Sequence, residues 1–318
     1  MKKILITGAS GQIGTELTEV LRNQYGVDNV IATNLHAGKN ETVEKNGLFE
    51  KLDVTDDIKL FELVRKYKVD TIINLAALLS AVGEKNPGLL WDVNMNGLYN
   101  CLEVSRETGA MLFTPSSIAA FGPNTPADQT PQDTIQRPST IYGVSKVAGE
   151  LLCDYYFKKF GVDTRGVRFP GLISYKALPG GGTTDYAVHI YYAALREKHF
   201  TCNLEGHTFM DMMYMPDAIE SILQISEADP SKLIHRNAFN ITAMSFCPED
   251  VKREIQKHIP EFTMDYQIDP VKQGIANSWP NSLDDSCARV EWGWNPKFDL
   301  KSMTIDMIEK LRIKLELK

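Results

Sequence analysis

The stretch that decides the fold is KKILITGASGQIG, residues 2–14, at the start of the chain. An apolar, β-rich run leads straight into three glycines spaced GxxGxxG, and an amphipathic helix pattern opens at the last of them. In that context the first glycine permits a tight turn, the second lets the backbone approach a pyrophosphate, and the third lets the helix pack closely on a sheet. The N-terminus of the helix would bind the phosphates. The alternative interpretation is a glycine turn that occurs by chance and binds no phosphate. The predicted dinucleotide contacts here are Gly8, Gly11, Gln12, Ile13 and Gly14.

Strand and helix patterns keep alternating through the first half of the chain. Further apolar, β-rich runs occur at residues 30–33, 49–52, 71–75, 111–114 and 164–169. Strands that alternate with helices form a parallel sheet covered on both faces, and such strands are apolar without strict alternation. We therefore predict an α/β fold with a Rossmann-type, doubly wound parallel sheet.

The pattern weakens in the second half. Helices expected near residues 185–198, 216–227, 248–258 and 302–315 are separated by irregular stretches. We predict an NAD-binding domain at residues 1–170, completed by segments that return from later in the chain. A smaller C-terminal α/β substrate lobe, not independent, is predicted at residues 171–318.

Composition narrows the class of protein. Hydrophobic residues make up 43% and charged residues 24% of the 318 residues, and the net charge is −7. This is ordinary globular composition, and without a basic block neither nucleic acid nor an anionic membrane is an expected partner. No apolar run has the length of a membrane helix, so we expect a cytoplasmic protein. The five cysteines are far apart and include no CxxC pair, so neither a disulfide framework nor a metal site is predicted.

In folds of this kind, the residue that binds the ribose of the dinucleotide normally lies at the end of the second strand, roughly 20 residues past the glycines. That position is Asn34, followed by Leu35. An aspartate there would bind the 2′-hydroxyl and repel a 2′-phosphate, whereas asparagine binds the hydroxyl without repelling phosphate. Because no arginine lies in residues 32–40, we predict NAD rather than NADP.

Other strand ends supply further candidate contacts to the cofactor. Asp53 either accepts a hydrogen bond from the adenine amino group or serves as a turn or N-cap residue. Asn94 lies in a helix pattern, where asparagine is unfavourable, so a buried polar role is predicted. The remaining predicted contacts are Val54, Leu75, Ala76, Ala77 and Pro170.

A YxxxK pair, Tyr142 and Lys146, places a phenol and an ammonium one turn apart on a helix. The ammonium favours the phenolate, so Lys146 would tune Tyr142 as a general base or acid and would also hold the nicotinamide ribose. An ordinary exposed helix pair has the same spacing. Ser116 and Ser117 follow the fifth strand, at the edge where such sheets bind ligands, and either hydroxyl would orient a substrate hydroxyl against the tyrosine.

Several stretches resemble the extended short-chain dehydrogenases/reductases, a superfamily that includes UDP-galactose epimerase and dTDP-glucose dehydratase. The resemblance rests on TGASGQIG (7–14), NLAA (74–77), PSSIAAFG (115–122) and YGVSK (142–146). Within that superfamily the chain is most similar to the short-chain-type L-threonine dehydrogenases. The strings that carry this likeness are WDVNMNGL (91–98), PSTIYGVSK (138–146), PGLISYKALPGGGTTDYAVHIYY (170–192), MMYMPDAIE (212–220) and IANSWPNSLDDSCARVEWGW (275–294).

The resemblance implies a specific reaction. It implies NAD-dependent oxidation of the L-threonine β-hydroxyl to 2-amino-3-oxobutanoate without a metal, with Tyr142 as general base and Lys146 holding the ribose. It also implies a homodimer formed through the helices at residues 94–108 and 142–160. The product would pass to a CoA-dependent lyase. The asparagine at position 34 departs from the aspartate usual in the family.

Residues missing from the second half favour a small substrate. A nucleotide sugar needs arginines for its diphosphate, but residues 172–283 contain only Arg196, Arg236 and Arg253. An amino acid needs an acceptor for its ammonium group, which Asp185 would supply, and donors for its carboxylate. Thr184 and Asp185 have the alternative role of helix capping, and Trp279 either covers the pocket or packs in the lobe core. The predicted substrate contacts are Ser80, Ser117, Tyr142, Gly182, Thr183, Thr184, Asp185 and Trp279.

Two other functions compete with a threonine dehydrogenase. A nucleotide-sugar epimerase or dehydratase of the same superfamily shares the nucleotide fold, but the missing arginines speak against it. A non-catalytic dinucleotide-sensing protein need not keep a serine, Tyr142 and Lys146 together. The loop at residues 178–186, which contains Gly180, Gly181 and Gly182, is interpreted as a closing lid over the nicotinamide end.

Overall fold

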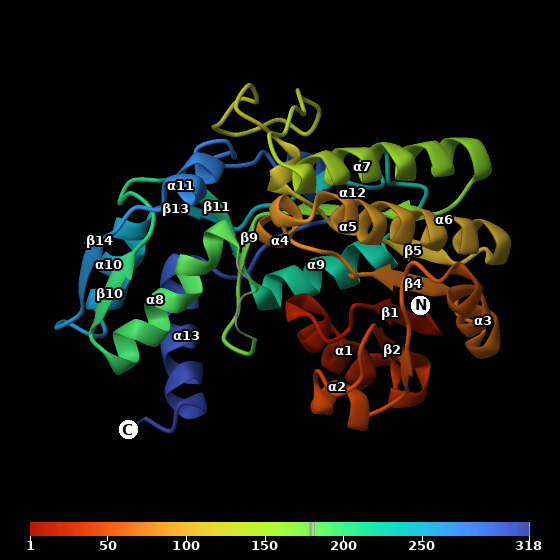
Figure 1. The fold of residues 1–318 in the computed structure, drawn as a ribbon, viewed down its shortest axis with the longest axis horizontal. Coiled ribbons are helices and arrows are strands. Elements are labelled where there is room, and N and C mark those ends of the chain that lie inside the picture. Colours follow the sequence, from red (N-terminus) through yellow and green to blue (C-terminus); the bar gives the residue numbers. More distant parts are fainter. Residues whose placement is uncertain (178–179, 181, 318) are drawn as a thin grey trace.

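The computed structural model describes residues 1–177, 180 and 182–317. A parallel six-stranded sheet forms the centre of the first half (Figure 1). Its order is β3 (Phe49–Lys51), β2 (Val30–Asn34), β1 (Ile4–Thr7), β4 (Thr71–Asn74), β5 (Met111–Phe113) and β7 (Thr164–Arg165). The chain order reverses between β1 and β4, and doubly wound sheets bind ligands at the carboxyl ends of the strands at such a point. The predicted Rossmann-type fold is confirmed.

Alternate residues of the strands bury opposite faces of the sheet. Leu5 and Ile72 pack with one set of helices, whereas Ile4 and Ile73 pack with the other. The first set comprises α3 (Asp57–Tyr67), α6 (Gly97–Thr108) and α7 (Ile141–Phe160). The second set comprises α1 (Gln12–Tyr25) and α9 (Met215–Glu227), which returns from the second half of the chain. Shorter helices connect these elements: η1 (Val27–Asn29), α2 (Glu41–Lys45), α4 (Ser80–Lys85), α5 (Pro87–Trp91), the π-helical η2 (Asp92–Asn96) and η3 (Ile118–Ala120).

The predicted single strand at residues 164–169 is wrong. The chain forms β7, which joins the main sheet, and then β8 (Val167–Phe169), which pairs with β6 (Ser116–Ser117) and β12 (Phe239–Asn240) in a second sheet. The break falls at Gly166, where a Cβ atom would lie only 2.3 Å from the carbonyl oxygen of Thr114. Glycine therefore lets the two backbones pass closely enough for the strand to change sheets.

Most of the elements after β8 build a second core. Two small sheets contain β9 (Gly171–Ile173), β11 (Met210–Tyr214) and β13 (Met244–Phe246), and β10 (His199–Cys202) with β14 (Thr263–Tyr266). The remaining helices are η4 (Thr183–Asp185), α8 (Tyr186–Arg196), α10 (Pro248–Gln256), α11 (Pro270–Ala276), α12 (Ser286–Trp292) and α13 (Leu300–Lys314). Tyr186, Tyr191, Met212 and Phe246 are buried within this core. The four helices expected in the second half correspond to α8, α9, α10 and α13.

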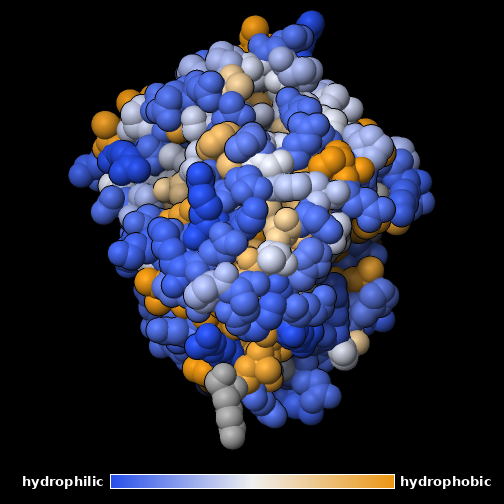
Figure 2. Space-filling model, turned by 90° about the vertical axis from the view of Figure 1, so that its left-hand side faces the viewer, coloured by the Kyte–Doolittle hydropathy of each residue, from blue (hydrophilic) through white to orange (hydrophobic). Residues whose placement is uncertain are grey.

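The outward face of these C-terminal elements is mostly hydrophilic, with small, separate hydrophobic areas (Figure 2). Among the residues that the structure describes, no helix combines the length and apolar character needed to cross a membrane.

Candidate active site

The glycine loop between β1 and α1 needs its glycines. Gly8 has a φ of +66°, and a Cβ atom on Gly14 would lie 2.5 Å from the carbonyl oxygen of Gly8. Two polar atoms of the loop, Ser10 Oγ and Gln12 Nε2, are buried without a hydrogen-bond partner among the described residues. A phosphate group would supply the missing acceptors, and the α1 N-terminus carries no side-chain cap that would compete for this position. The loop therefore fits the pyrophosphate of a dinucleotide.

Asn34, the residue predicted to bind the ribose, lies at the end of β2, beside this loop. Asn34 is buried, and its Nδ2 donates a 3.1 Å hydrogen bond to the carbonyl oxygen of His36, whereas Leu35 is exposed. Asp53 lies in an exposed turn, where its carboxylate accepts hydrogen bonds from the amide and hydroxyl of Thr55 at 3.0 and 2.7 Å. The N-cap of α3 is Asp56, so of the structural roles considered for Asp53 the turn is the observed one.

The π-helical segment η2 carries Asn94, whose predicted buried polar role is confirmed. Its side chain accepts a 2.8 Å hydrogen bond from the Leu78 amide and donates to the Leu78 carbonyl oxygen at 3.1 Å and to Ser145 Oγ at 3.5 Å. Val54 packs closely against Gly97, the residue that follows η2. A Cβ atom on Gly97 would lie only 2.6 Å from Val54 Cγ1. Asn94 thus ties the segment after β4 to helix α7.

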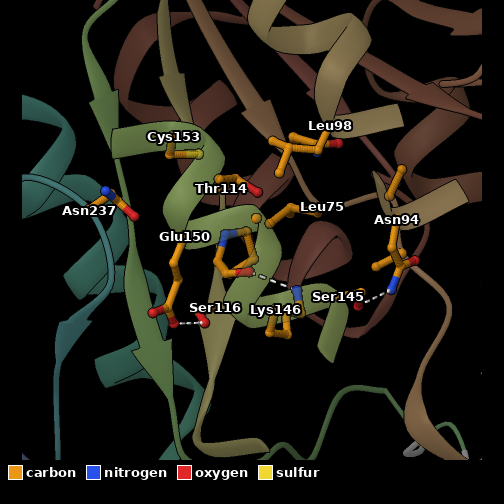
Figure 3. Close-up of a pocket in the computed structure, with 15 residues that line it drawn as sticks. Leu75, Asn94, Leu98, Thr114, Ser116, Ser145, Lys146, Glu150, Cys153 and Asn237 are labelled. Atoms are coloured by element: carbon orange, nitrogen blue, oxygen red, sulfur yellow. Dashed lines mark hydrogen bonds between the residues drawn. The ribbon is translucent and has the colours of Figure 1, made fainter. Parts of the chain in front are cut away.

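A pocket opens at the carboxyl ends of β4 and β5 (Figure 3). It brings together predicted cofactor contacts and the predicted reactive lysine, although they come from distant parts of the sequence. Those of its lining residues that were predicted from the sequence are Leu75, Ala76, Ala77, Asn94, Ser116 and Lys146. Pro170, another predicted contact, is buried between β8 and β9.

Helix α7 carries the reactive pair Tyr142 and Lys146, of which Lys146 lines this pocket. Its N-cap is Thr140, whose hydroxyl oxygen accepts a 3.0 Å hydrogen bond from the Gly143 amide. The Lys146 ammonium donates a 2.7 Å hydrogen bond to the Pro115 carbonyl oxygen and lies 5.3 Å from the centre of the Tyr142 ring. Both side chains are partly buried, so this is not an ordinary solvent-exposed helix pair.

The structure distinguishes the two candidate serines. Ser116 is buried, and its hydroxyl donates to the Glu150 carboxylate, away from Lys146 (Figure 3). Ser117 is partly buried and is the N-cap of η3, where its hydroxyl oxygen accepts a 3.2 Å hydrogen bond from the Ala119 amide. An acceptor role leaves the Ser117 hydroxyl hydrogen available to a substrate oxygen, whereas that of Ser116 is already used.

The predicted substrate residues after the glycine run form the short helix η4. Asp185 caps it, because its Oδ2 accepts a 2.6 Å hydrogen bond from the Gly182 amide. Thr184 packs on β9, since a Cβ atom on Gly171 would lie 2.7 Å from Thr184 Cγ2, and Thr183 is buried. The capping alternative is therefore observed for Asp185, and it does not conflict with a binding role. Residues 178, 179 and 181 of the predicted lid lie outside the described residues.

Two further predicted substrate residues lie in other elements. Ser80 is buried at the first position of α4. Trp279 is partly buried and packs both on the C-terminal core and on a small cluster of Ile118, Phe121 and Leu283. The predicted lobe-core role of Trp279 is therefore observed, and the same ring reaches the cluster beside η3.

Reasoning from the sequence missed Glu150, which lines the pocket four residues after Lys146. The available signal was the i, i+4 spacing, which places its carboxylate on the helix face of Lys146. Its partner Arg168 lies within an apolar strand pattern, where an arginine needs a buried acceptor. The pair could therefore have been suspected from the sequence, but not matched without the fold.

One group of potential metal ligands occurs among the described residues, formed by His235, Cys287 and Glu291. Within it His235 Nδ1 contacts one oxygen of Glu291, and the other oxygen accepts hydrogen bonds from the Ile234 and His235 amides. These contacts already satisfy the histidine and the carboxylate, so they explain the cluster without an ion.

Comparisons with known proteins identify the family of the chain and its similar structures. Residues 4–242 match the model of the NAD dependent epimerase/dehydratase family. An uncharacterized epimerase/dehydratase of Staphylococcus aureus (strain USA300) is 60% identical over 314 residues, which cover 99% of this chain and 98% of the relative. An X-ray structure of L-threonine dehydrogenase from Clostridium difficile is 61% identical with a TM-score of 0.98, covering 99% of this chain and 98% of the other. The holo form of a GalE-like L-threonine dehydrogenase from Cupriavidus necator is 47% identical with a TM-score of 0.94, covering 97% and 99%.

Proposed function

The chain belongs to the NAD-dependent epimerase/dehydratase family of extended short-chain dehydrogenases/reductases, and from this we propose that it is an NAD-dependent L-threonine 3-dehydrogenase. It oxidises the β-hydroxyl of L-threonine to a ketone and yields 2-amino-3-oxobutanoate. The observation that carries the proposal is that Lys146, whose ammonium lies 5.3 Å from the centre of the Tyr142 ring, lines one pocket together with Ser116 and Ala76. The backbone of Ala76 also packs against Gly8 of the glycine loop, which has unsatisfied donors.

NAD accepts a hydride when it is bound, and the chain's own residues hold it. Ser10, Gln12 and the N-terminus of α1 would bind the pyrophosphate, and Asn34 would bind the adenine ribose. Lys146 would hold the nicotinamide ribose from the pocket beside Ala76. Because Asn34 is uncharged, selectivity against NADP would rest on the absence of arginine near this site.

Tyr142 acts as the general base. Its phenolate takes the proton of the substrate β-hydroxyl, and the Ser117 hydroxyl donates a hydrogen bond to the same oxygen and orients it. The Lys146 ammonium, anchored on the Pro115 carbonyl oxygen, stabilises the phenolate from one helical turn away. Asp185 accepts from the substrate ammonium group, while Thr183 or Thr184 and the backbone of η4 donate to the carboxylate.

The three arginines of residues 172–283 support a substrate without phosphates. Arg236 donates to the Asp163 carboxylate at 2.6 Å and covers the Phe157 ring at 4.0 Å. Arg253 pairs with Asp250, three residues earlier in α10, and Arg196 lies over the Tyr192 ring. All three guanidinium groups therefore have contacts elsewhere, and none of these contacts involves the pocket. A nucleotide-sugar epimerase or dehydratase, the second candidate function, would need such groups for its diphosphate.

A substrate panel separates the two functions. NAD reduction is followed with L-threonine, D-threonine and L-serine, and turnover of UDP-sugars is measured by product analysis. The experiment is repeated with NADP. L-Threonine should give the highest kcat/KM and UDP-sugars no turnover. Turnover of a UDP-sugar without NAD reduction by L-threonine would refute the proposal in favour of the epimerase.

We also propose a homodimer formed through α6 and α7, which lie side by side (Figure 1). Tyr99, Leu151 and Tyr155 expose large apolar side chains on these helices, and Leu151 is 62% exposed. Leu151→Glu should therefore halve the mass measured by light scattering. Ile313→Glu, which charges a comparably exposed residue of α13, should leave the mass unchanged. A dimer that survives Leu151→Glu would place the interface elsewhere. The product, a β-keto acid, would pass to a CoA-dependent lyase.

A further inference from the structure

Glu150 is a buried carboxylate that lines the pocket. The side chains of Glu150 and Arg168 are each 7% exposed. Arg168 Nε and Nη2 donate to the two carboxylate oxygens at 3.0 and 2.8 Å, which is the bidentate geometry of a strong pair. Gln136 Nε2 donates to Oε2 at 2.7 Å, and the Ser116 hydroxyl donates to Oε1. Four donors therefore hold this carboxylate in one orientation.

The same contacts join the two elements that carry the proposed chemistry. Helix α7 bears Tyr142, Lys146 and Glu150 at successive turns. Lys146 donates to the Pro115 carbonyl oxygen, and Glu150, one turn later, accepts from the side chain of Ser116. Two consecutive residues of the segment that leads to Ser117 are thus held by two consecutive turns of the helix (Figure 3).

Arg168 extends this attachment to the second sheet. It lies on β8, and its Cα is the register partner of Ser116 on β6. Its Nη1 donates to the Gln132 carbonyl oxygen at 2.8 Å and to Asn240 Oδ1 at 3.0 Å. Two sets of contacts therefore fix the position of β6 relative to α7. One is the hydrogen bond from Ser116 to Glu150, and the other is the pairing of β6 with β8, whose Arg168 also binds Glu150.

We infer that Glu150 is a positioning residue: through Ser116 and Arg168 it sets the distance between the Ser117 hydroxyl and the Tyr142 phenol. This inference rests on the proposed roles of Ser117 and Tyr142. A buried ion pair is weak evidence for a stabilising role, because apolar residues of similar volume often stabilise a fold as well. A displacement of about 1 Å between reacting groups, however, can lower a rate about a hundredfold.

The test is the substitution Glu150→Gln. Glutamine keeps the shape but replaces one acceptor oxygen by an NH2 group, which then faces a donor of Ser116, Arg168 or Gln136. We expect kcat to fall about 10- to 100-fold. The affinity for NAD, measured by quenching of protein fluorescence, and the KM for the substrate should stay within about threefold, since no direct contact is removed.

Asp163→Asn is the matched control. Asp163 binds Arg165 through the same bidentate geometry, at 3.0 and 2.8 Å, and also binds Arg236. The other hydrogen bonds of these two guanidinium groups go to carbonyl oxygens of residues 225–230, not to residues 115–117. This variant should lower the melting temperature and leave kcat within about twofold of the wild type. The proposal is overturned if Glu150→Gln retains wild-type kcat. It is also overturned if Asp163→Asn loses kcat to the same extent at an equal loss of thermal stability.

A second variant covers the case in which Glu150→Gln does not fold. Ser116→Ala removes only the link between Glu150 and β6, and kcat should fall about three- to tenfold. A kcat equal to the wild type would overturn the proposal. In the double variant the two effects should be less than additive, because both break the same link. If the wild type rejects threonine but turns over another substrate, the threonine proposal fails and the same variants are compared on that substrate.

Discussion

The Lys146 ammonium nitrogen lies 5.3 Å from the centre of the Tyr142 ring, one turn away along α7. The carbonyl oxygen of Pro115 holds this ammonium at 2.7 Å and so keeps it on the pocket side of the helix. A cation in this position stabilises negative charge on the phenol without being consumed in the reaction. The relationship makes Tyr142 the group that is expected to take up the proton of the substrate hydroxyl.

Tyr142→Phe should lower kcat by about 10²–10⁴-fold, because general-base catalysis contributes a factor of that size. The affinity for NAD should change little, since the phenylalanine ring keeps the packing beside Lys146. Initial rates with L-threonine and NAD binding by fluorescence check both statements. Retained turnover would remove Tyr142 from the base role.

Ser117→Ala should reduce kcat about 10- to 100-fold, as expected for loss of a hydrogen bond to an oxygen that gains charge. This loss should exceed that of Ser116→Ala, because the Ser116 hydroxyl is engaged by Glu150. Kinetics of the two single variants on the same substrate decide the order. The reverse order would assign substrate orientation to Ser116.

Asp185→Asn should raise the KM for L-threonine about 10- to 100-fold and leave the KM for NAD nearly unchanged. The asparagine oxygen can still accept from the Gly182 amide, so the cap of η4 is kept while the charge is lost. Asp299→Asn, at the N-cap of α13, is the control for removing a capping charge. Equal effects on both substrates' KM values would favour a purely capping role for Asp185.

Burial raises the pKa of Asp211 to about 8 and outweighs the hydrogen bonds that its carboxyl group accepts from Thr242 and the Leu283 amide. In the unfolded chain an aspartate has a pKa of about 4. The stability that comes from the neutral form is therefore complete below about pH 4 and is lost as the pH rises through about 8. Because asparagine does not ionise, the variant Asp211→Asn should not lose this stability as the pH rises.

Urea unfolding of the wild type and Asp211→Asn, at pH values below and above the Asp211 pKa, tests this expectation. The free energy of unfolding of the variant relative to the wild type should increase with pH. A difference that stays constant across the range would show that Asp211 does not titrate there.

The first half of the fold could be predicted because its signals are local. The GxxGxxG loop and five of the β-rich runs each encode their element within a few residues, so β1 to β5 appear where expected. The run at residues 164–169 was misassigned because the change of sheet at Gly166 depends on Thr114, about fifty residues earlier in the chain. The small sheets of the second half depend on equally distant pairings, such as Thr201 with Asp265.

The site, like the fold, could be predicted from the sequence only where its signals are local. Tyr142 and Lys146 could be paired because helix geometry fixes their separation. The Glu150–Arg168 pair and the difference between Ser116 and Ser117 depend on how α7 packs against β6 and β8. That packing cannot be inferred from the periodicity of the sequence. The capping role of Asp185 was foreseen as an alternative, because an aspartate at the start of a helix pattern has this local use.

Transfer of the β-hydrogen is the most direct measure of the central claim. L-Threonine deuterated at its β-carbon is incubated with the protein and NAD, and the reduced cofactor is analysed by mass spectrometry. The account predicts NADH that is heavier by one mass unit, together with a slower initial rate whenever the hydride step limits turnover. Reduced cofactor without deuterium, or no reduction by threonine while another substrate of the family is turned over, would contradict it.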